Sequence, residues 1–378
     1  MRKIVLIGTA HPYRGGLASF NERLIEEFIR EGDKAEILTF TLQYPNFLFP
    51  GKTQYSNSPK PNIPIERAVS SVNPVNWIKV GKRLKKEAPD LILFKYWLPF
   101  MAPCFGTIAK IAKPNKKTKV IAIIDNIIPH EKRIGDKMLS TYFVNNVDAF
   151  VGMSKSVLED LNLFDAHKPK KYNPHPIFDN FGELVEKEEA LEHLGLDRSY
   201  SYILFFGFIR DYKGLDLLLK AFANSWFRTQ KIKLIIAGEF YNNQQQYIDL
   251  IEELKLKDDI ILKSDFIPNE EVKYYFRASS IVAQPYKNAT QSGVTQIAYH
   301  FEKPMLVTNV GGLAELVPNG KVGYVVEPNE QAIAEALITY FKEGKEQEFE
   351  HNVRQEKEKF SWRKMVETIN TLADEIQK

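Results

Sequence analysis

The second half of the chain alternates short apolar runs with segments of helical periodicity, and this alternation is what most constrains the fold. The runs are rich in Ile, Leu and Val and have no polar face, as expected for strands buried on both sides of a parallel sheet. They fall at residues 202–206, 232–237, about 259–263, 280–284, 304–308 and 323–326. This half is therefore predicted to be an α/β domain with a parallel sheet.

The first half shows the same alternation. Its apolar runs fall at residues 4–8, 36–40, 91–96, 120–124 and 149–152, with helical patterns from Leu17 and over 76–87. Residues 41–64 read as a long loop, and 168–181, with three prolines, read as the connection between domains. A chain of 378 residues has room for two cores. We expect domains at 1–178 and 179–359, with a closing amphipathic helix over about 360–378.

The amino-acid composition limits which class of protein this chain can belong to. Hydrophobic content of 44% and charged content of 26% are typical of a soluble globular protein, and no apolar run is long enough to span a membrane. The apolar run after Arg2-Lys3 is too short for a signal sequence. The single cysteine, Cys104, excludes an intramolecular disulfide and argues against a cysteine metal site. We expect a cytoplasmic protein that binds no metal.

Charge is divided unevenly between the halves. Residues 1–178 hold 27 Lys and Arg against 16 Asp and Glu, a net +11, whereas the remainder holds 24 against 32, a net −8. A basic half suits a phosphate-bearing acceptor or the inner face of a membrane, and no motif accompanies it that would favour nucleic acid. The basic helix at 76–87 and the aromatic segment at 97–103 are where peripheral membrane contact would occur. A solvated lysine surface and ordinary core packing of the aromatics are the alternatives.

Two places in the first half present candidate ligand groups. His11 and the pair Gly15-Gly16 lie in the loop before the first helix, where glycine allows a ligand to approach the backbone. This loop lacks the Gly-x-Gly-x-x-Gly fingerprint, which argues against a dehydrogenase. Asp125 stands at the tip of the fourth strand, followed by Asn126 and His130. Open parallel sheets bind ligands at such strand ends, although Asp125 could instead close a local turn.

In the second half, successive strands end in glycine or polar turns. Gly207 ends the first and is followed by Arg210 and Lys213, two cations able to neutralise a diphosphate. Ser292 is placed to cap a helix, with Gly293 and Val294 after it, so free backbone N–H groups would attract a phosphate there. These turns share one edge of the predicted sheet, which indicates a cleft for a phosphorylated ligand rather than an ordinary helix cap.

These pieces together resemble the GT-B glycosyltransferases and, within them, the large retaining family four. They occur in the family's order over nearly the whole chain: Gly15-Gly16, Gly207 with Arg210, Lys213 and Gly214, Ala237-Gly238-Glu239, Pro285-Tyr286, Ser292-Gly293-Val294, Lys303-Pro304, Gly311-Gly312 with Glu315, and Gly323-Tyr324. The resemblance implies two Rossmann-like domains with parallel sheets facing across a cleft. The N-terminal domain would hold the acceptor and the C-terminal domain the nucleotide sugar, and the final helix would return to the first domain.

The resemblance also implies roles. Arg210 and Lys213 would contact the donor diphosphate, replacing a metal, and Ile267 would flank the nucleobase. The other donor-binding residues would be Gly15, Gly16, Gly207, Glu239, Thr290, Gln291, Ser292, Gly293 and Val294. The family's usual histidine is replaced by Asp125, and its two glutamates by Ala289 and Ile297, so sugar and ribose contacts should differ.

Three functions remain open from the sequence. The first is a retaining, metal-independent glycosyltransferase without a cofactor, moving a sugar from a nucleoside diphosphate sugar to a glycan or lipid-linked acceptor, in bacterial surface polysaccharide biosynthesis by family analogy. Asp125 would then orient or deprotonate the acceptor, or bind the donor sugar. The others are a non-catalytic nucleotide-sugar-binding partner subunit and a GT-B nucleotide-sugar epimerase.

Overall fold

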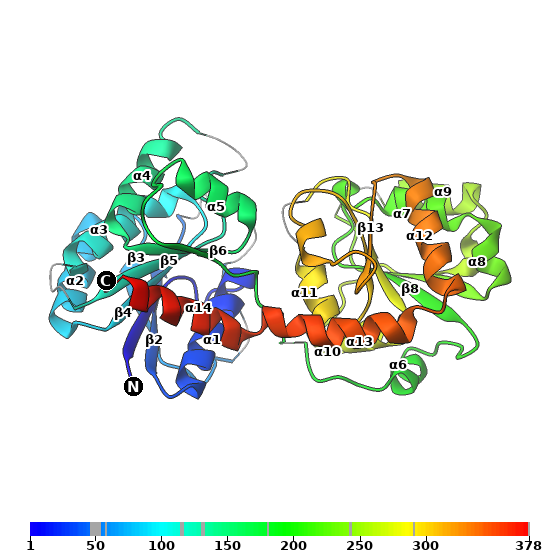
Figure 1. Cartoon of the computed structure of the whole chain (residues 1–378), viewed down its shortest axis with the longest axis horizontal. Helices are drawn as coiled ribbons and strands as arrows, with labels where there is room; N and C mark the ends of the chain where they lie inside the picture. The colour runs from blue at the N-terminus through cyan, green and yellow to red at the C-terminus, as the bar shows by residue number, and fades with distance from the viewer. Residues whose placement is uncertain are drawn as a thin grey trace. The chain divides into compact units, whose positions relative to one another are not determined.

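A computed structural model describes residues 1–45, 54–56, 59–113, 117–129, 133–179, 181–241, 244–289 and 292–376. The chain divides into two compact units (Figure 1). The N-terminal unit consists of Met1–His175 together with Trp362–Lys378, and the C-terminal unit is Pro176–Ser361.

The N-terminal unit is built on a parallel sheet with strand order β3-β2-β1-β4-β5-β6-β7. Its strands are β1 (Lys3–Ile7), β2 (Lys34–Leu42), β3 (Ile65–Ser70), β4 (Leu91–Tyr96), β5 (Lys119–Ile124), β6 (Ala149–Gly152) and β7 (Lys170–Tyr172). Its helices are α1 (Gly16–Arg30), α2 (Pro74–Glu87), α3 (Ala102–Ala112), α4 (Asp136–Asn146), α5 (Lys155–Asn162) and α14 (Trp362–Glu375).

This unit has two hydrophobic cores, one on each face of its sheet, and alternate strand residues pack into one or the other. In β1, Ile4 and Leu6 pack with α1 and α14, whereas Val5 and Ile7 pack with α2, α3 and α4. Figure 1 shows α14 beside α1, where the rings of Phe20 and Trp362 meet edge to face. Both faces of the sheet are therefore covered, which is why its central strands read as continuous apolar runs.

The C-terminal unit repeats this architecture with strand order β10-β9-β8-β11-β12-β13, all parallel. Its strands are β8 (Ser201–Phe206), β9 (Ile232–Ala237), β10 (Ile260–Lys263), β11 (Ile281–Gln284), β12 (Met305–Thr308) and β13 (Gly323–Val326). Its helices are α6 (Lys187–His193), α7 (Leu215–Phe222), α8 (Ser225–Thr229), α9 (Gln245–Glu253), α10 (Asn269–Ala278), α11 (Gly293–His300), α12 (Glu330–Lys342) and α13 (Glu346–Glu356).

The prediction of two Rossmann-like domains with parallel sheets is confirmed. One detail was wrong and one strand was missed. Residues 170–172, placed in the connection between domains, form the edge strand β7. The segment after the predicted loop, for which no strand was predicted, forms the opposite edge strand, β3. The segment 342–359 is mostly exposed, and its helix α13 contributes Phe349 and Val353 to the core. Within the described ranges, no helix is long and apolar enough to cross a membrane.

Candidate functional site

The strand order of the C-terminal unit reverses between β8 and β11. From β8 the chain proceeds outward to β9 and β10, and it then returns to the other side of β8 with β11. The loops that leave β8 and β11 therefore diverge at this point, and open α/β sheets bind ligands in the crevice so formed. The predicted residues Gly207, Lys213 and Ser292 all lie in these two loops.

Glycines hold these loops in backbone contact. Gly214 has a φ of +68°, and a Cβ there would lie 2.0 Å from the carbonyl oxygen of Pro285. Gly238, at the end of β9, has a φ of +146°, and its Cβ would lie 2.2 Å from the carbonyl oxygen of Gly207. A side chain at either position would force the backbones apart, so the three strand exits close up only because both residues are glycine.

Ser292 caps α11 as predicted. Its Oγ accepts a hydrogen bond of 3.2 Å from the backbone N–H of Val294 and lies 3.1 Å from the hydroxyl of Tyr286. Burial raises the pKa of Tyr286 well above its ordinary value, so its hydroxyl stays protonated. The Val294 amide, expected to be free for a phosphate, is thus already bonded to Ser292. Gly293 lies on the cavity wall described next.

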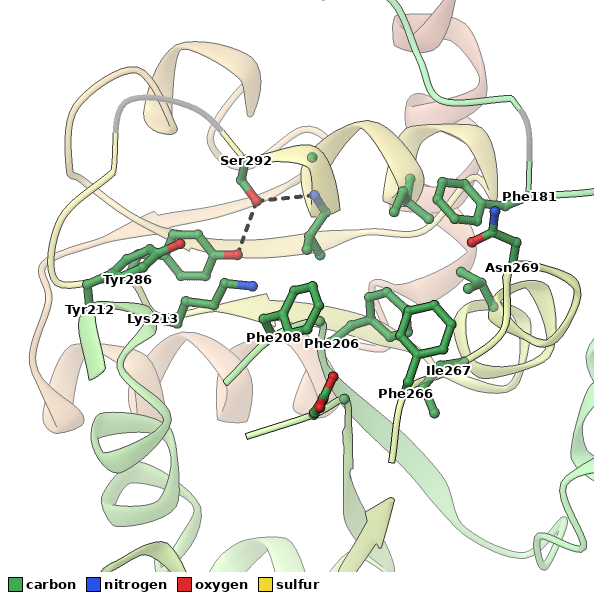
Figure 2. Close-up of a pocket in the computed structure, with 17 residues that line it drawn as sticks. Phe181, Phe206, Phe208, Tyr212, Lys213, Phe266, Ile267, Asn269, Tyr286 and Ser292 are labelled. Atoms are coloured by element: carbon green, nitrogen blue, oxygen red, sulfur yellow. Dashed lines mark hydrogen bonds between the residues drawn. The ribbon is translucent and has the colours of Figure 1, made fainter. Parts of the chain in front are cut away.

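A cavity of about 370 Å³ opens at this crevice (Figure 2). One end is polar, and Figure 2 shows Lys213 pointing toward Tyr286 and Ser292 there. The other end is apolar, with Phe266, Ile267 and Phe181 around it. Apart from Phe181, which precedes α6, the lining residues come from the ends of β8, β9, β10 and β11 and from α10 and α11: Phe181, Phe206, Gly207, Phe208, Tyr212, Lys213, Gly238, Glu239, Phe266, Ile267, Asn269, Val272, Tyr286, Ser292, Gly293, Val294 and Ile297.

Lys213 is a buried cation. It is 8% exposed, and no carboxylate of the described residues pairs with it. Burial, and then repulsion from Arg210, lowers the pKa of Lys213 from 10.5 to about 8. A buried charge without a partner is destabilising unless a ligand compensates it. The polar end of the cavity is therefore suited to an anion.

The other predicted residues of this unit lie around that cation. Glu239, Ile267 and Val294 line the cavity. Arg210 does not line it; its guanidinium is exposed and stacks 4.0 Å from the ring centre of Tyr241. Thr290 and Gln291 lie outside the described residues. The structure thus brings together Lys213, the capped N-terminus of α11 and Ile267 around one cavity, which Arg210 does not line.

In the N-terminal unit, Asp125 forms an ion pair that the sequence did not indicate. Its Oδ1 lies 2.6 Å from Nζ of Lys95, on the neighbouring strand β4. Lys95 is 1% exposed, and its Nζ lies 3.7 Å above the ring of Phe20. Burial lowers the pKa of Lys95, while the carboxylate of Asp125 opposes that shift. Asp125 is 21% exposed, and no described residue donates to its Oδ2.

The other predicted residues of this unit are His11, Gly15, Gly16, Asn126 and His130. His11 donates its backbone N–H to Glu22, at 2.6 Å. Gly15 caps α1 with a φ of +105°, and neither Gly15 nor Gly16 would meet any atom within 4 Å of an added Cβ. Asn126 is half-buried, and His130 lies outside the described residues.

Sequence reasoning missed two sets of residues. The first is Lys95, whose position inside an apolar strand was the only available signal. The second is the aromatic wall of the cavity, of which Phe208 and Phe266 are large side chains left exposed at strand ends. The sequence signal that could have found this set is the presence of Phe208 and Phe266 shortly after predicted strands.

The comparisons with known proteins agree on one class of enzyme. Residues 186–360 match the family model described as glycosyl transferases group 1. An uncharacterized glycosyltransferase of Methanocaldococcus jannaschii is 22% identical over 378 residues, 99% of this chain and 98% of its own. A D-inositol 3-phosphate glycosyltransferase of Corynebacterium urealyticum is 26% identical over 267 residues, 66% of this chain and 62% of its own.

Solved structures share the fold. A glycosyltransferase from Rickettsia africae matches with a TM-score of 0.72 at 16% identity, over 100% of this chain and 99% of that one. The Anabaena protein HepE, solved in complex with UDP, matches with a TM-score of 0.69 at 17% identity, over 98% and 100%. The resemblance to GT-B glycosyltransferases of group 1 is therefore confirmed, and retaining family four is compatible with these findings.

Proposed function

We propose that this group 1 glycosyltransferase moves a sugar, with retention, from a nucleoside diphosphate sugar to a glycan or lipid-linked acceptor. The observation that carries the proposal is Lys213, a buried lysine without a carboxylate partner among the described residues, at the polar end of a cavity of about 370 Å³. A diphosphate would supply the missing negative charge, and the aromatic end would receive the nucleobase. The HepE complexes with UDP and UDP-glucose support a donor of this class.

In the reaction, an acceptor hydroxyl forms a bond to the anomeric carbon of the donor sugar. The bond from that carbon to the diphosphate breaks, and the diphosphate leaves with the electron pair. The proton of the hydroxyl passes to the leaving diphosphate or to solvent. Lys213, with Arg210 beside it, would stabilise the charge that grows on the diphosphate, which is why we propose that no metal is required.

Asp125 would act on the acceptor by orientation. Lys95 holds Oδ1, so the carboxylate is fixed, while Oδ2 remains without a donor from any described residue. A fixed carboxylate can accept a hydrogen bond from an acceptor hydroxyl and align it for attack. Asp125→Asn should lower turnover while UDP binding stays unchanged. Unchanged turnover would reject this role.

One observation favours a second function, a non-catalytic binding subunit. Ile297 lies on the cavity wall, where the family resemblance implies a glutamate. The ribose side of the cavity therefore offers no carboxylate at this position, and we propose that residues 288–297 set the donor choice. A thermal-shift panel of nucleotide sugars would identify the donor, because a bound ligand raises apparent stability. Transfer or hydrolysis of that donor by the purified chain would exclude the binding subunit.

A further inference from the structure

An apolar groove begins two residues after Asp125. It has a volume of about 320 Å³, and its lining residues lie in the loop after β5, at the start of α4 and directly after α5. The apolar lining residues are Ile127, Ile128, Pro129, Leu163 and Phe164. A volume of this size is within the range of small-molecule sites.

Three strongly exposed apolar side chains lie at or beside this groove. Apart from Met1, the three most exposed large apolar side chains are Ile134, Met138 and Leu163. Leu163 lines the groove, and Ile134 and Met138 each adjoin a lining residue in sequence. Single exposed apolar residues are ordinary, but a cluster beside a groove indicates a surface that binds an apolar partner.

Cations lie on the same wall. The side chains of Arg133 and Lys137 line the groove, and neither is paired with a carboxylate of the described residues. Asp136, the one carboxylate among the described residues that line the groove, accepts a hydrogen bond of 2.7 Å from the backbone N–H of Arg133. The groove thus combines an apolar lining with two cations that have no carboxylate partner among the described residues. This combination complements an amphiphile that has an anionic head and an apolar tail.

We propose that the acceptor is carried on a lipid phosphate whose apolar chain occupies this groove. The phosphate would lie against Arg133 and Lys137, and the hydroxyl that is glycosylated would extend toward Asp125. This inference rests on the proposed function, from which it takes the transfer step, and it selects the lipid-linked acceptor over a free glycan.

Binding of alkyl phosphates to the full-length protein tests the proposal without any donor. The probes are dodecyl phosphate below its critical micelle concentration, butyl phosphate and inorganic phosphate, titrated by calorimetry. Burial of each methylene strengthens binding about fourfold, so four buried methylenes would make dodecyl phosphate bind on the order of 100-fold more tightly than butyl phosphate. Equal affinities for the two alkyl phosphates would overturn the proposal.

Matched variants locate the site. Leu163→Glu changes a residue that is 67% exposed and should weaken dodecyl phosphate binding at least ~10-fold, as should Arg133→Ala combined with Lys137→Ala. Val75→Glu, at a residue on α2 that is 60% exposed, should leave it unchanged. A loss in Val75→Glu without a loss in Leu163→Glu would place the contact on α2 and overturn the assignment.

The same variants separate this inference from the proposed function. Each should bind UDP like the wild type, because the cavity proposed for UDP belongs to the other unit. UDP binding without dodecyl phosphate binding would overturn only the lipid inference. Dodecyl phosphate binding without UDP binding would overturn only the proposed donor site.

Discussion

Replacing Lys213 by methionine tests whether the cavity is built to hold an anion. Methionine keeps an unbranched apolar stem but removes the ammonium. The lowering of the Lys213 pKa from 10.5 to about 8 corresponds to a cost of about 3 kcal/mol for keeping the charged form in the folded state. We therefore expect Lys213→Met to raise the free energy of unfolding of the C-terminal unit by up to ~3 kcal/mol near neutral pH.

The size of this gain should depend on pH. Because the pKa of Lys213 is lowered on folding, the unfolded chain binds more protons than the folded chain between about 8 and 10.5. Stability of the wild type should therefore rise with pH across that window. The cost of the buried charge is fully present below about 8 and disappears as the pH approaches 10.5, so the difference between wild type and Lys213→Met should shrink there.

Ligand binding should change in the opposite direction. A hydrogen bond from an ammonium to a phosphate contributes ~1.5–3 kcal/mol, so Lys213→Met should weaken UDP binding by roughly 10- to 150-fold. Calorimetry with UDP measures this directly. Lys220→Met is the matched control, since Lys220 is an exposed cation on α7 and should affect neither stability nor UDP binding.

The stability measurement must report on the C-terminal unit. Whole-chain unfolding would mix two transitions, so urea unfolding should be followed by pulsed hydrogen exchange of peptides from β8 and β11. If Lys213 had a purely structural role, the Lys213→Met variant would be less stable than the wild type and would bind UDP with unchanged affinity. Either result in Lys213→Met would refute the assignment of Lys213 as an anion ligand.

Three further predictions concern the loops and the ion pair. Gly214→Ala should destabilise the C-terminal unit by well over ~2 kcal/mol, because its Cβ would lie 2.0 Å from a carbonyl oxygen. The control Gly195→Ala, with a φ of +66° and nothing within 4 Å, should cost only ~1–2 kcal/mol. Equal losses of stability in urea unfolding would contradict the clash. Asp125→Leu should lower the free energy of unfolding by ~3–5 kcal/mol, because it leaves the Lys95 ammonium buried without a counter-ion. Adding Lys95→Met should recover most of this loss. A double variant as unstable as Asp125→Leu would contradict the prediction. Ser292→Ala should cost about 1 kcal/mol through the lost helix cap, and an unchanged unfolding midpoint would argue against that cap.

The central strands could be predicted from the sequence because they are buried on both faces. β8 and β9, for example, consist almost wholly of apolar residues and lie within one residue of the predicted ranges. The edge strands β3 and β7 could not be predicted in the same way. They are half-solvated, contain charged residues and have a partner on one side only, so no apolar run marks them.

The candidate site was predictable where it depends on backbone geometry and not where it depends on long-range pairing. Ser292, Gly214 and Lys213 occur in turns whose local sequence indicates their conformation. The Lys95–Asp125 pair joins residues 30 positions apart on neighbouring strands. No periodicity distinguishes a lysine buried at that place from one that reaches solvent, and only the register of β4 against β5 reveals it.

The close approach of Gly214 to Pro285, and of Gly238 to Gly207, has a consequence for protein engineering. Three strand exits touch through their backbones, without side chains that could be trimmed to make room. A loop transplanted from a relative into one of these positions would need to reproduce the carbonyl positions of its neighbours. Attempts to change donor preference by loop grafting should therefore exchange the exits of β8, β9 and β11 as one cassette.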